Sequence, residues 1–242
     1  MVIYMYMCDL SMTTFKKVKE SVNTIILPIG MVEAHGPHCS LATDILIPRE
    51  FLKRLDTIIG EKVIIAPEIS YGHSWENSPF PGTISLSNEV FSNYVYEIAR
   101  GFFKQGFKNI VLFNGHGGNQ SGLKNVSERI AELGGVVLTI NWWVDYREEI
   151  KTIVENPGHA GEDETSLMLA INQKYADISL VGHHEVTLPR NIVFKDWGKS
   201  AFPEAYFGNA GAATAEKGEK IYELLLPIML KEFENLWSIN QR

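Results

Sequence analysis

The sequence PIGMVEAHGPHCSLATDILIP, from Pro28 to Pro48, organises the rest of the chain, because it follows a predicted strand with a loop of polar side chains. The run TIILPI at Thr24–Ile29 predicts that strand, since short, continuous and β-branched runs are typical of strands covered on both faces. Gly30, Gly36 and Pro37 disfavour helix in the residues that follow. The loop therefore starts at the carboxyl end of a buried strand.

Four side chains in this loop form a candidate metal site: Glu33, His35, His38 and Asp44. Imidazole nitrogens and carboxylate oxygens together suit a divalent ion such as zinc, manganese or iron. The Gly-Pro pair between the two histidines excludes a shared helical face, so we expect His38 to support a ligand rather than to bind the metal. Other segments must supply the rest of the site.

The composition is that of an ordinary globular protein. The 242 residues suit a single domain over residues 1–242, since no linker-like stretch divides them. Hydrophobic residues make up 45% and charged residues 21%, so neither a disordered nor a fibrous class is indicated. The net charge of −7, without a stripe of lysine and arginine, argues against nucleic acid as a partner.

Two further features bear on where the protein works. The two cysteines, Cys8 and Cys39, cannot form a disulfide framework and favour a reducing cytoplasm. The apolar stretch MVIYMYMCDL at the N-terminus is too short, and too soon interrupted by Asp9, for a signal peptide or a membrane span. We therefore expect a cytoplasmic protein with no membrane partner.

Strands and amphipathic helices alternate along the rest of the chain. Further strands are predicted at 63–66, 110–113 and 136–140, and helices at 11–21, 49–59, 88–105, 120–133, 147–155, 164–172 and 214–237. The stretch 178–191 fits either strand or loop. This alternation predicts a mostly parallel sheet with helices on both faces. Ligands gather at the carboxyl ends of such strands, where both the opening loop and NGHGGN at Asn114–Asn119 lie.

The candidate ligands at strand ends and helix entries are more than one metal needs: Glu33, His35, Asp44, His116, His159 and Glu164. Three carboxylates facing two divalent ions leave one positive charge, which one hydroxide would cancel. A carboxylate such as Asp44 could bridge two ions about 3.5–4 Å apart, as in two-metal hydrolases. The count favours a hydrolase with two divalent metal ions, either zinc, manganese or iron.

Four ordered motifs resemble the creatininase (creatinine amidohydrolase) family: GMVEAHGPHCSLATD, FPGTISL, NGHGGN and HAGEDETSLML. The likeness runs from about Ile25 to Gly218. It implies a three-layer α/β/α sandwich and a metal-dependent hydrolase that cleaves a non-peptide or cyclic C–N amide bond. It also implies a homo-oligomer, often a hexamer.

Carried over residue by residue, the family's metal ligands fall on Glu33, His35, Asp44 and His116, with Asp44 as the bridge. Creatininase itself has a glutamate two residues after the second histidine, where this chain has Gly118. This departure weakens creatinine as the substrate. Relatives with NGHGGN keep the glutamate of HAGxxE, so we expect Glu164 to replace the missing carboxylate.

Two further departures from the family lie in segments that we expect to contact the substrate. Cys39-Ser40 stands where the family usually has Leu-Pro, and Asn77 stands near a position that is often histidine. Both change the chemistry offered to a substrate, which keeps the identity of that substrate open.

Several roles remain open from sequence. His159 is a candidate proton shuttle for the leaving amine, with a packing or ligand-supporting role as the alternative. Glu164, the second candidate catalytic residue, could instead stabilise the start of its helix. Gly117, Gly118 and Trp143 are candidate substrate contacts, and a place in the core is the alternative for the tryptophan.

The predicted function is hydrolysis of a small-molecule amide by a metal-activated water. One alternative is a formamide deformylase acting on a formylaminopyrimidine-type cofactor precursor, and another is a peptide-cleaving maturase of the same family. A metal- or nucleotide-binding domain without catalysis is the alternative from a different class. It would bind its ligand tightly and turn over no amide.

Overall fold

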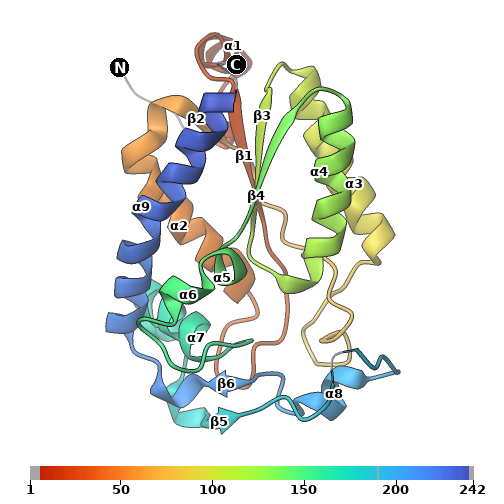
Figure 1. Cartoon of the computed structure of the whole chain (residues 1–242), viewed down its shortest axis with the longest axis vertical. Helices are drawn as coiled ribbons and strands as arrows, with labels where there is room; N and C mark the ends of the chain where they lie inside the picture. The colour runs from red at the N-terminus through yellow and green to blue at the C-terminus, as the bar shows by residue number, and fades with distance from the viewer. Residues whose placement is uncertain (1–5, 190, 240–242) are drawn as a thin grey trace.

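Four parallel strands form the central sheet of the computed structural model, which describes residues 6–189 and 191–239. They are β1 (Thr24–Ile29), β2 (Val63–Ile65), β3 (Asn109–Asn114) and β4 (Val136–Asn141), in the spatial order β2-β1-β3-β4 (Figure 1). β1 and β3 pair over their whole length, so their carboxyl ends lie level. Every residue of these two strands is buried, as expected of strands covered on both faces.

Helices cover both faces of the sheet. One face carries α2 (Thr43–Ile59), α7 (Glu162–Ile171) and α9 (Ala215–Ile239), and the other carries α3 (Asn88–Lys104) and α4 (Gln120–Glu132) (Figure 1). Each face has its own core, with Phe51 and Tyr222 in the first and Phe91 and Leu123 in the second. The predicted three-layer α/β/α sandwich with a mostly parallel sheet is confirmed.

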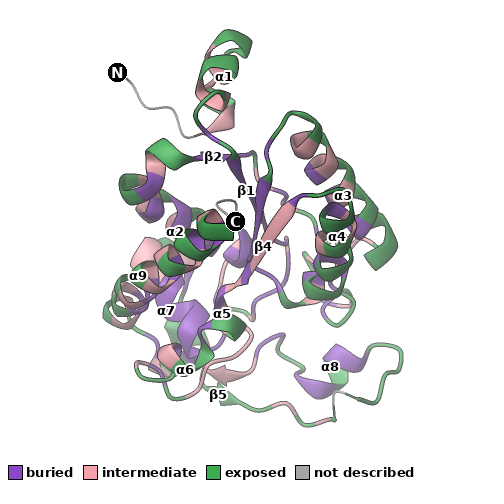
Figure 2. Ribbon diagram, turned by 45° about the horizontal axis from the view of Figure 1, so that its top comes forward, coloured by how far each residue is buried: buried purple, intermediate pink, exposed green. Residues whose placement is uncertain are grey.

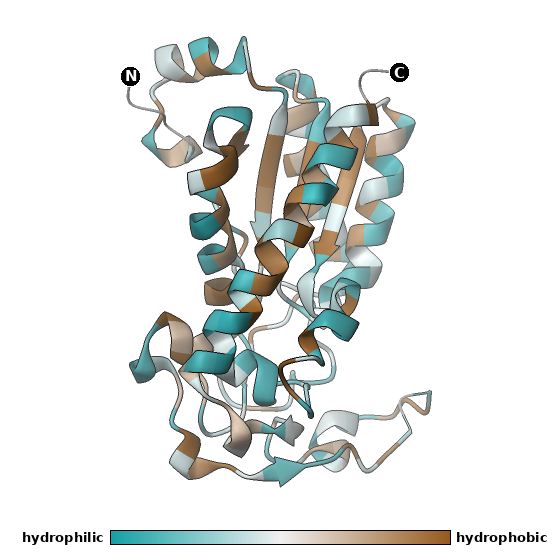
Figure 3. Cartoon of the chain, turned by 60° about the vertical axis from the view of Figure 1, so that its left-hand side comes forward, coloured by the Kyte–Doolittle hydropathy of each residue, from teal (hydrophilic) through white to brown (hydrophobic). Residues whose placement is uncertain are grey.

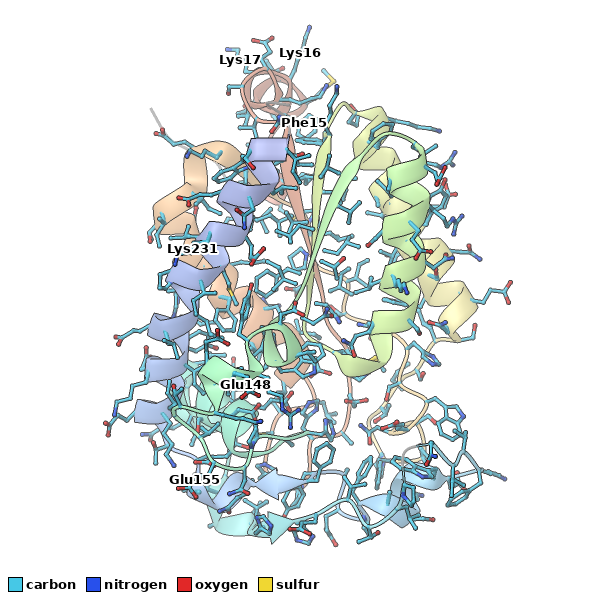
Figure 4. The ribbon with its side chains drawn as sticks, in the orientation of Figure 1. Phe15, Lys16, Lys17, Glu148, Glu155 and Lys231 are labelled. Carbon is cyan, nitrogen blue, oxygen red and sulfur yellow. The ribbon has the colours of Figure 1, made fainter. Side chains whose placement is uncertain are left out.

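Burial and hydropathy follow these layers. β1 and α7 are largely buried, whereas the outer sides of α3, α4 and α9 are exposed (Figure 2). Apolar residues line the strands and the helix sides that face them (Figure 3). The helix α1 (Met12–Lys19) precedes β1 and packs Phe15 edge-on against Phe107, while Lys16 and Lys17 extend outward (Figure 4).

The remaining elements are short. They are η1 (Met7–Asp9), η2 (Gly60–Lys62), η3 (Gly117–Asn119), α5 (Trp142–Asp145), α6 (Arg147–Ile150), η4 (Gln173–Tyr175), η5 (Ile178–Leu180), β5 (His183–His184), α8 (Trp197–Ala201), β6 (Gly208–Asn209) and η6 (Ala210–Ala212). β5 and β6 pair antiparallel. None of the described helices is long and apolar enough to cross a membrane.

Two helices that carry candidate site residues begin earlier than the sequence pattern indicates. α2 begins at Thr43 rather than Arg49, so Asp44 lies in its first turn, with Pro48 inside the helix. α7 begins at Glu162, which places Glu164 in its first turn. Hydrophobic periodicity marks only the part of a helix that packs on the core. The first turn of α7 is acidic and faces the cluster described next. In α2, the pattern indicates a later start because Pro48 suits the first turn of a helix, although Ile45 and Leu46 before it are already buried.

Candidate metal centre

The backbone of Asp44 sits between the carboxyl ends of β1 and β3. Gly30 follows β1 and Gly115 follows β3, and a Cβ atom on either would lie 2.6 or 2.1 Å from the Asp44 carbonyl oxygen. Only glycine therefore allows the first turn of α2 to approach both strand ends so closely. This approach places the Asp44 side chain at the edge of the sheet where ligands bind in such folds.

The two carboxylate oxygens of Asp44 face two different groups of side chains. Oδ1 lies 3.1 Å from His35 Nε2, which in turn lies 3.6 Å from Glu164 Oε2. Oδ2 lies 3.0 Å from His116 Nδ1, which is 3.3 Å from Glu33 Oε2. Five predicted ligands thus form two triads that share Asp44, and a third group combines Glu33 and His35 with His159. Each triad has its ligand atoms within 4.8 Å of one another.

Each histidine of the cluster uses its second ring nitrogen to contact a backbone carbonyl. His35 Nδ1 lies 3.1 Å from the Glu33 oxygen, and His116 Nε2 lies 3.0 Å from the His73 oxygen. A carbonyl only accepts hydrogen bonds, so these nitrogens carry the proton. The other nitrogen of each ring faces the carboxylates, and it offers a lone pair to a metal once its proton is displaced.

The donor set fits divalent cations. Glu33 Oε2 and Asp44 Oδ2 are buried and have no hydrogen bond of acceptable geometry among the described residues. Glu33 Oε1 accepts a hydrogen bond from Ser74, which orients the carboxylate. Buried carboxylate oxygens are normally paired, and a cation between them and His116 Nδ1 would satisfy both. The mixed nitrogen and oxygen set suits zinc, manganese or iron.

Protons take part in holding the cluster together when no cation is bound. Burial opposes a charge on His35, but Asp44, Glu164 and Glu33 outweigh it and raise the pKa of His35 to about 10. Glu33 and Asp44 likewise outweigh burial and raise the pKa of His116 to about 9. Burial raises the pKa of Glu164 to about 8. Cations must displace these protons, because metal ligands bind in their deprotonated forms.

Gly118 leaves no room for a side chain. A Cβ atom there would lie 2.0 Å from the His73 carbonyl oxygen and 2.7 Å from His116 Nε2. The carboxylate that creatininase carries at this position is therefore excluded by the same backbone that orients His116. Glu164, the predicted replacement, lies 3.6 Å from His35 Nε2 through its Oε2, which also accepts a hydrogen bond from Ala160 N at 2.6 Å.

His159 lies at the edge of the cluster. Its ring is 4.3 Å from that of His35 between centroids, and its Nδ1 is 3.7 Å from Glu33 Oε2. Burial and the nearby His35 lower the pKa of His159 to about 4, so the ring is neutral at neutral pH. A neutral imidazole beside the carboxylates can accept a proton and later return it.

The cluster opens into a cavity of about 1190 Å³. Gly117, Gly118 and Trp143 line it, as do His159 and Glu164. Trp142, the neighbouring tryptophan, is fully buried in the core and contacts Trp143 edge-on. Of these two tryptophans, Trp143 is therefore the one that can reach a substrate.

Other histidines take supporting or peripheral positions. His38 is buried, and its Nε2 lies 3.0 Å from the carbonyl oxygen of Ala160, the residue that follows His159. It supports the loop that carries His159 through Ala160, and within the described part of the chain its side chain hydrogen-bonds to no predicted metal ligand. His183 and His184 are exposed and line the outer part of the cavity.

Sequence reasoning missed Ser74 and the backbone role of His73. Their contacts to Glu33 and His116 span more than 40 residues. No local signal encodes such pairings. Gly118 is the one signal in the sequence for the role of His73, because a glycine in place of a ligand indicates that another group, here the His73 carbonyl, lies close to the backbone.

Comparison with known proteins places the chain among hydrolases. The sequence model of the family described as "Creatininase: Creatinine amidohydrolase" matches residues 8–232. The chain is 30% identical to the creatinine amidohydrolase of Pseudomonas putida over 223 residues, which cover 83% of this chain and 84% of that protein. It is 26% identical over 252 residues to the 3-dehydro-scyllo-inosose hydrolase of Thermotoga maritima, covering 90% of this chain and 80% of that protein.

A third relative acts on a peptide. The mycofactocin precursor peptide peptidase of Mycolicibacterium smegmatis is 27% identical over 226 residues, covering 88% of this chain and 85% of that protein. Among solved structures, a zinc–zinc form of a mutant creatininase superposes with a TM-score of 0.83 at 26% identity, covering 96% of this chain and 98% of that chain. A manganese form of creatininase gives a TM-score of 0.82 at 26% identity with the same coverage.

Proposed function

The chain belongs to the creatininase family of metal-dependent amidohydrolases, and we propose that it cleaves a non-peptide or cyclic C–N amide bond at the cluster around Asp44. The observation that carries this proposal is the orientation of the Asp44 carboxylate, with one oxygen toward His35 and the other toward His116. A shared carboxylate between two triads is what a two-metal hydrolase needs.

The ligand roles follow from the two triads. Glu33, Asp44 and His116 would hold one divalent ion, and His35, Asp44 and Glu164 would hold the other. Zinc and manganese are the ions named for the related creatininase structures, and the same ions or iron suit this donor set. When bound, such cations lower the pKa of water toward about 7 and polarise a carbonyl group.

His159 would move the proton. Its neutral ring can take a proton at Nδ1 from the attacking water and deliver it to the leaving nitrogen, which departs as an amine. Glu164 contributes to catalysis as a ligand that also fixes the Ala160 amide, and so the loop carrying His159. Gly117, Gly118 and Trp143 would form the cavity wall against which the substrate lies.

The substrate that we propose first is a small-molecule amide. A peptide terminus is the second candidate, because a cavity of about 1190 Å³ exceeds the roughly 300–1,000 Å³ of ordinary small-molecule pockets. A formylaminopyrimidine-type formamide fits the same chemistry. Creatinine itself is disfavoured by the loss of the carboxylate at Gly118.

Three further properties belong to this proposal. We place the protein in the cytoplasm, supported by its two free cysteines. We take residues 1–242 as one catalytic domain, supported by the two cores that share a single sheet. We expect a homo-oligomer, and a hexamer where the family pattern holds.

The test combines metal analysis with a substrate screen. Protein loaded separately with zinc, manganese or iron would be analysed for metal content and incubated with cyclic amides, formamides and short peptides. We expect two ions per chain and turnover of one class, with His159→Gln losing about 10²- to 10⁴-fold in kcat. The control is Lys124→Gln, an exposed position on α4 that does not line the cavity. Metal binding without turnover of any amide would favour the non-catalytic alternative, and absence of metal binding would refute both.

A further inference from the structure

The segment 77–83, which contains the FPG sequence and Thr83, contacts His159 through two routes that the metal cluster does not explain. Resting on the proposed function, we propose that Asn77 and Thr83 are positioning residues that hold the His159 proton on Nε2. Nδ1 is then the only nitrogen of His159 that exchanges protons with the reacting atoms. His159 is the catalytic residue, and the two others act through it.

The first route runs through the backbone of Ala34. This residue lies between the ligands Glu33 and His35, and its N–H donates a hydrogen bond to Thr83 Oγ1 at 3.0 Å. Its carbonyl oxygen lies 3.0 Å from His159 Nε2. Because a carbonyl oxygen can only accept, Nε2 must carry the hydrogen. Thr83 thus anchors, through the amide of Ala34, the residue whose carbonyl oxygen selects the tautomer.

The second route is the Asn77 side chain, which is 5% exposed and lies 3.1 Å from the same His159 nitrogen. The contacting end is assigned as Nδ2, which would set two donors against each other once Nε2 carries a hydrogen. Turning the carboxamide by 180° leaves its shape unchanged and presents Oδ1, so that Nε2–H is shared between two acceptors. As assigned, the far end of this amide, Oδ1, is buried and has no partner among the described residues.

The opposite side of the ring faces the cluster. Nδ1 lies 3.7 Å from Glu33 Oε2, and the ring is flanked by Phe202 and Phe207 at 6.2 Å between centroids. These apolar neighbours offer no competing hydrogen bond for Nδ1. Half a turn of the ring about its Cβ–Cγ bond would move Nδ1 away from the cluster and break the contact with Ala34. The ring is therefore held in one orientation and one tautomer.

The direct test is nitrogen NMR of the zinc-loaded protein with ¹⁵N-labelled histidine. We expect the His159 signals, assigned by their loss in His159→Gln, to show a protonated Nε2 and an unprotonated Nδ1. Asn77→Asp keeps an acceptor and should keep this pattern, whereas Asn77→Ala and Thr83→Val should produce a mixture of tautomers. A protonated Nδ1 in the unmodified protein would overturn the inference.

Kinetics give a second readout. We expect Asn77→Ala to lower kcat by about 10- to 100-fold with KM and metal content unchanged, and Asn77→Asp to restore part of the loss. Ser78→Ala is the matched control, because the Ser78 hydroxyl donates a hydrogen bond to the Trp75 carbonyl oxygen in the same loop and none to His159. If Asn77→Ala leaves both the His159 tautomer and kcat unchanged, Asn77 does not position His159. If the unmodified protein hydrolyses no amide, the proposed function fails, and the NMR pattern alone still decides the tautomer.

Discussion

Asp44 is the residue on which the two halves of the site depend. Its oxygens lie 3.1 Å from His35 Nε2 and 3.0 Å from His116 Nδ1, so it contacts both triads, whereas His35 belongs to the half that contains Glu164. We expect Asp44→Ala to lose both metal ions and His35→Ala to lose mainly one. Elemental analysis after gel filtration measures this, with the exposed His183→Ala as control. Full metal content in Asp44→Ala would contradict the shared ligand.

Gly118 and its neighbour Gly117 make a matched pair. A Cβ atom at 118 would lie 2.0 Å from the His73 carbonyl oxygen, while one at 117 would first meet Trp143 at 4.0 Å. We expect Gly118→Ala to lower the free energy of unfolding by about 1–3 kcal/mol, as overpacking does. Gly117→Ala should change it by less than about 0.5 kcal/mol. Urea denaturation measures the stability of both variants. Equal midpoints would show that the His73 backbone shifts to make room for the added methyl group.

His38 should make the protein sensitive to acid. Burial, reinforced by the charge on His35, lowers the pKa of His38 to about 4, although its contact with the Ala160 oxygen opposes the shift. The unfolded chain takes up this proton near pH 6.5, so the folded state loses about 1.4 kcal/mol per pH unit from there down to about pH 4. In His38→Gln this loss is absent.

The measurement is the free energy of unfolding of both proteins at pH 7 and pH 5. His38→Gln is expected to be the less stable at pH 7, because it packs less well beside Tyr206. The difference should shrink by about 2 kcal/mol at pH 5. A difference that stays constant between the two pH values would show that His38 is not held neutral.

At the level of single residues, the sequence predicts which side chains form the cluster. It predicts less well which residues hydrogen-bond to them. Glu33, His35 and His116 could be grouped because strand ends of a parallel sheet share one edge. Asn77 and Ser74 could not, since their contacts to His159 and Glu33 join residues 82 and 41 positions apart through a loop with no periodic pattern. Such pairings depend on how that loop folds over the sheet.

Among the elements, α7 has an unusual first turn, because its three acidic side chains bind backbone amides of the loop before it. Glu162 Oε2 accepts from the amides of Glu155 and Asn156 at 3.0 and 3.1 Å, and Asp163 accepts from Gly158 at 3.0 Å. Glu164 accepts from Ala160. Glu155, at the start of this loop, is labelled in Figure 4. The helix thereby fixes the segment that carries His159.

The helix α9 supplies the countercharge for this arrangement. Lys217 Nζ lies 2.5 Å from Glu162 Oε1, and the side chain of Glu162 is only 2% exposed. Gly218 allows α9 to approach α7, since a Cβ atom there would lie 2.0 Å from the Ser166 carbonyl oxygen. Removing the lysine would leave a buried carboxylate without its partner, which is costly.

We therefore expect Lys217→Met to destabilise the protein by about 2 kcal/mol, below the ~3–5 kcal/mol of a fully buried pair because Lys217 is 31% exposed. Hydrogen exchange of the amides at 155–160 should accelerate. Lys220→Met is the matched control, because its pair with Glu216 is exposed and contributes about 0–1 kcal/mol. Unchanged hydrogen exchange in Lys217→Met would show that Glu162 fixes this loop without the lysine.

For elements as a whole, hydrophobic periodicity located the strands and long helices to within a few residues. It missed the acidic first turn of α7, which faces the cluster rather than the core. It also placed the start of α2 after Pro48, although Leu46 and Ile47 before it belong to the core. It also left the stretch after residue 178 undecided. The strand β5 has two residues, too few for any period to appear, and its pairing with β6 joins segments about 25 residues apart.

For the whole molecule, the sequence predicts the α/β/α layers because each strand and helix buries an apolar face that must meet another. The site could be predicted only in part, since its carboxylates and histidines are stabilised by ions and backbone contacts rather than by hydrophobic burial. The buried acidic residues Glu33, Asp44 and Glu164 lie together at one end of the sheet. Their mutual repulsion opposes folding unless protons or cations offset it.

Metal binding should therefore stabilise the whole fold. At free metal about 100 times the dissociation constant, one site adds about 2.7 kcal/mol, which corresponds to about 5–11 °C in Tm for a protein of this size. We expect chelation to lower Tm and zinc or manganese to restore it, as differential scanning calorimetry would show. Asp44→Ala is the control, because its Tm should no longer respond to metal. An equal response in both proteins would place the stabilising ion outside the cluster, since only ions held by Asp44 are lost in this variant.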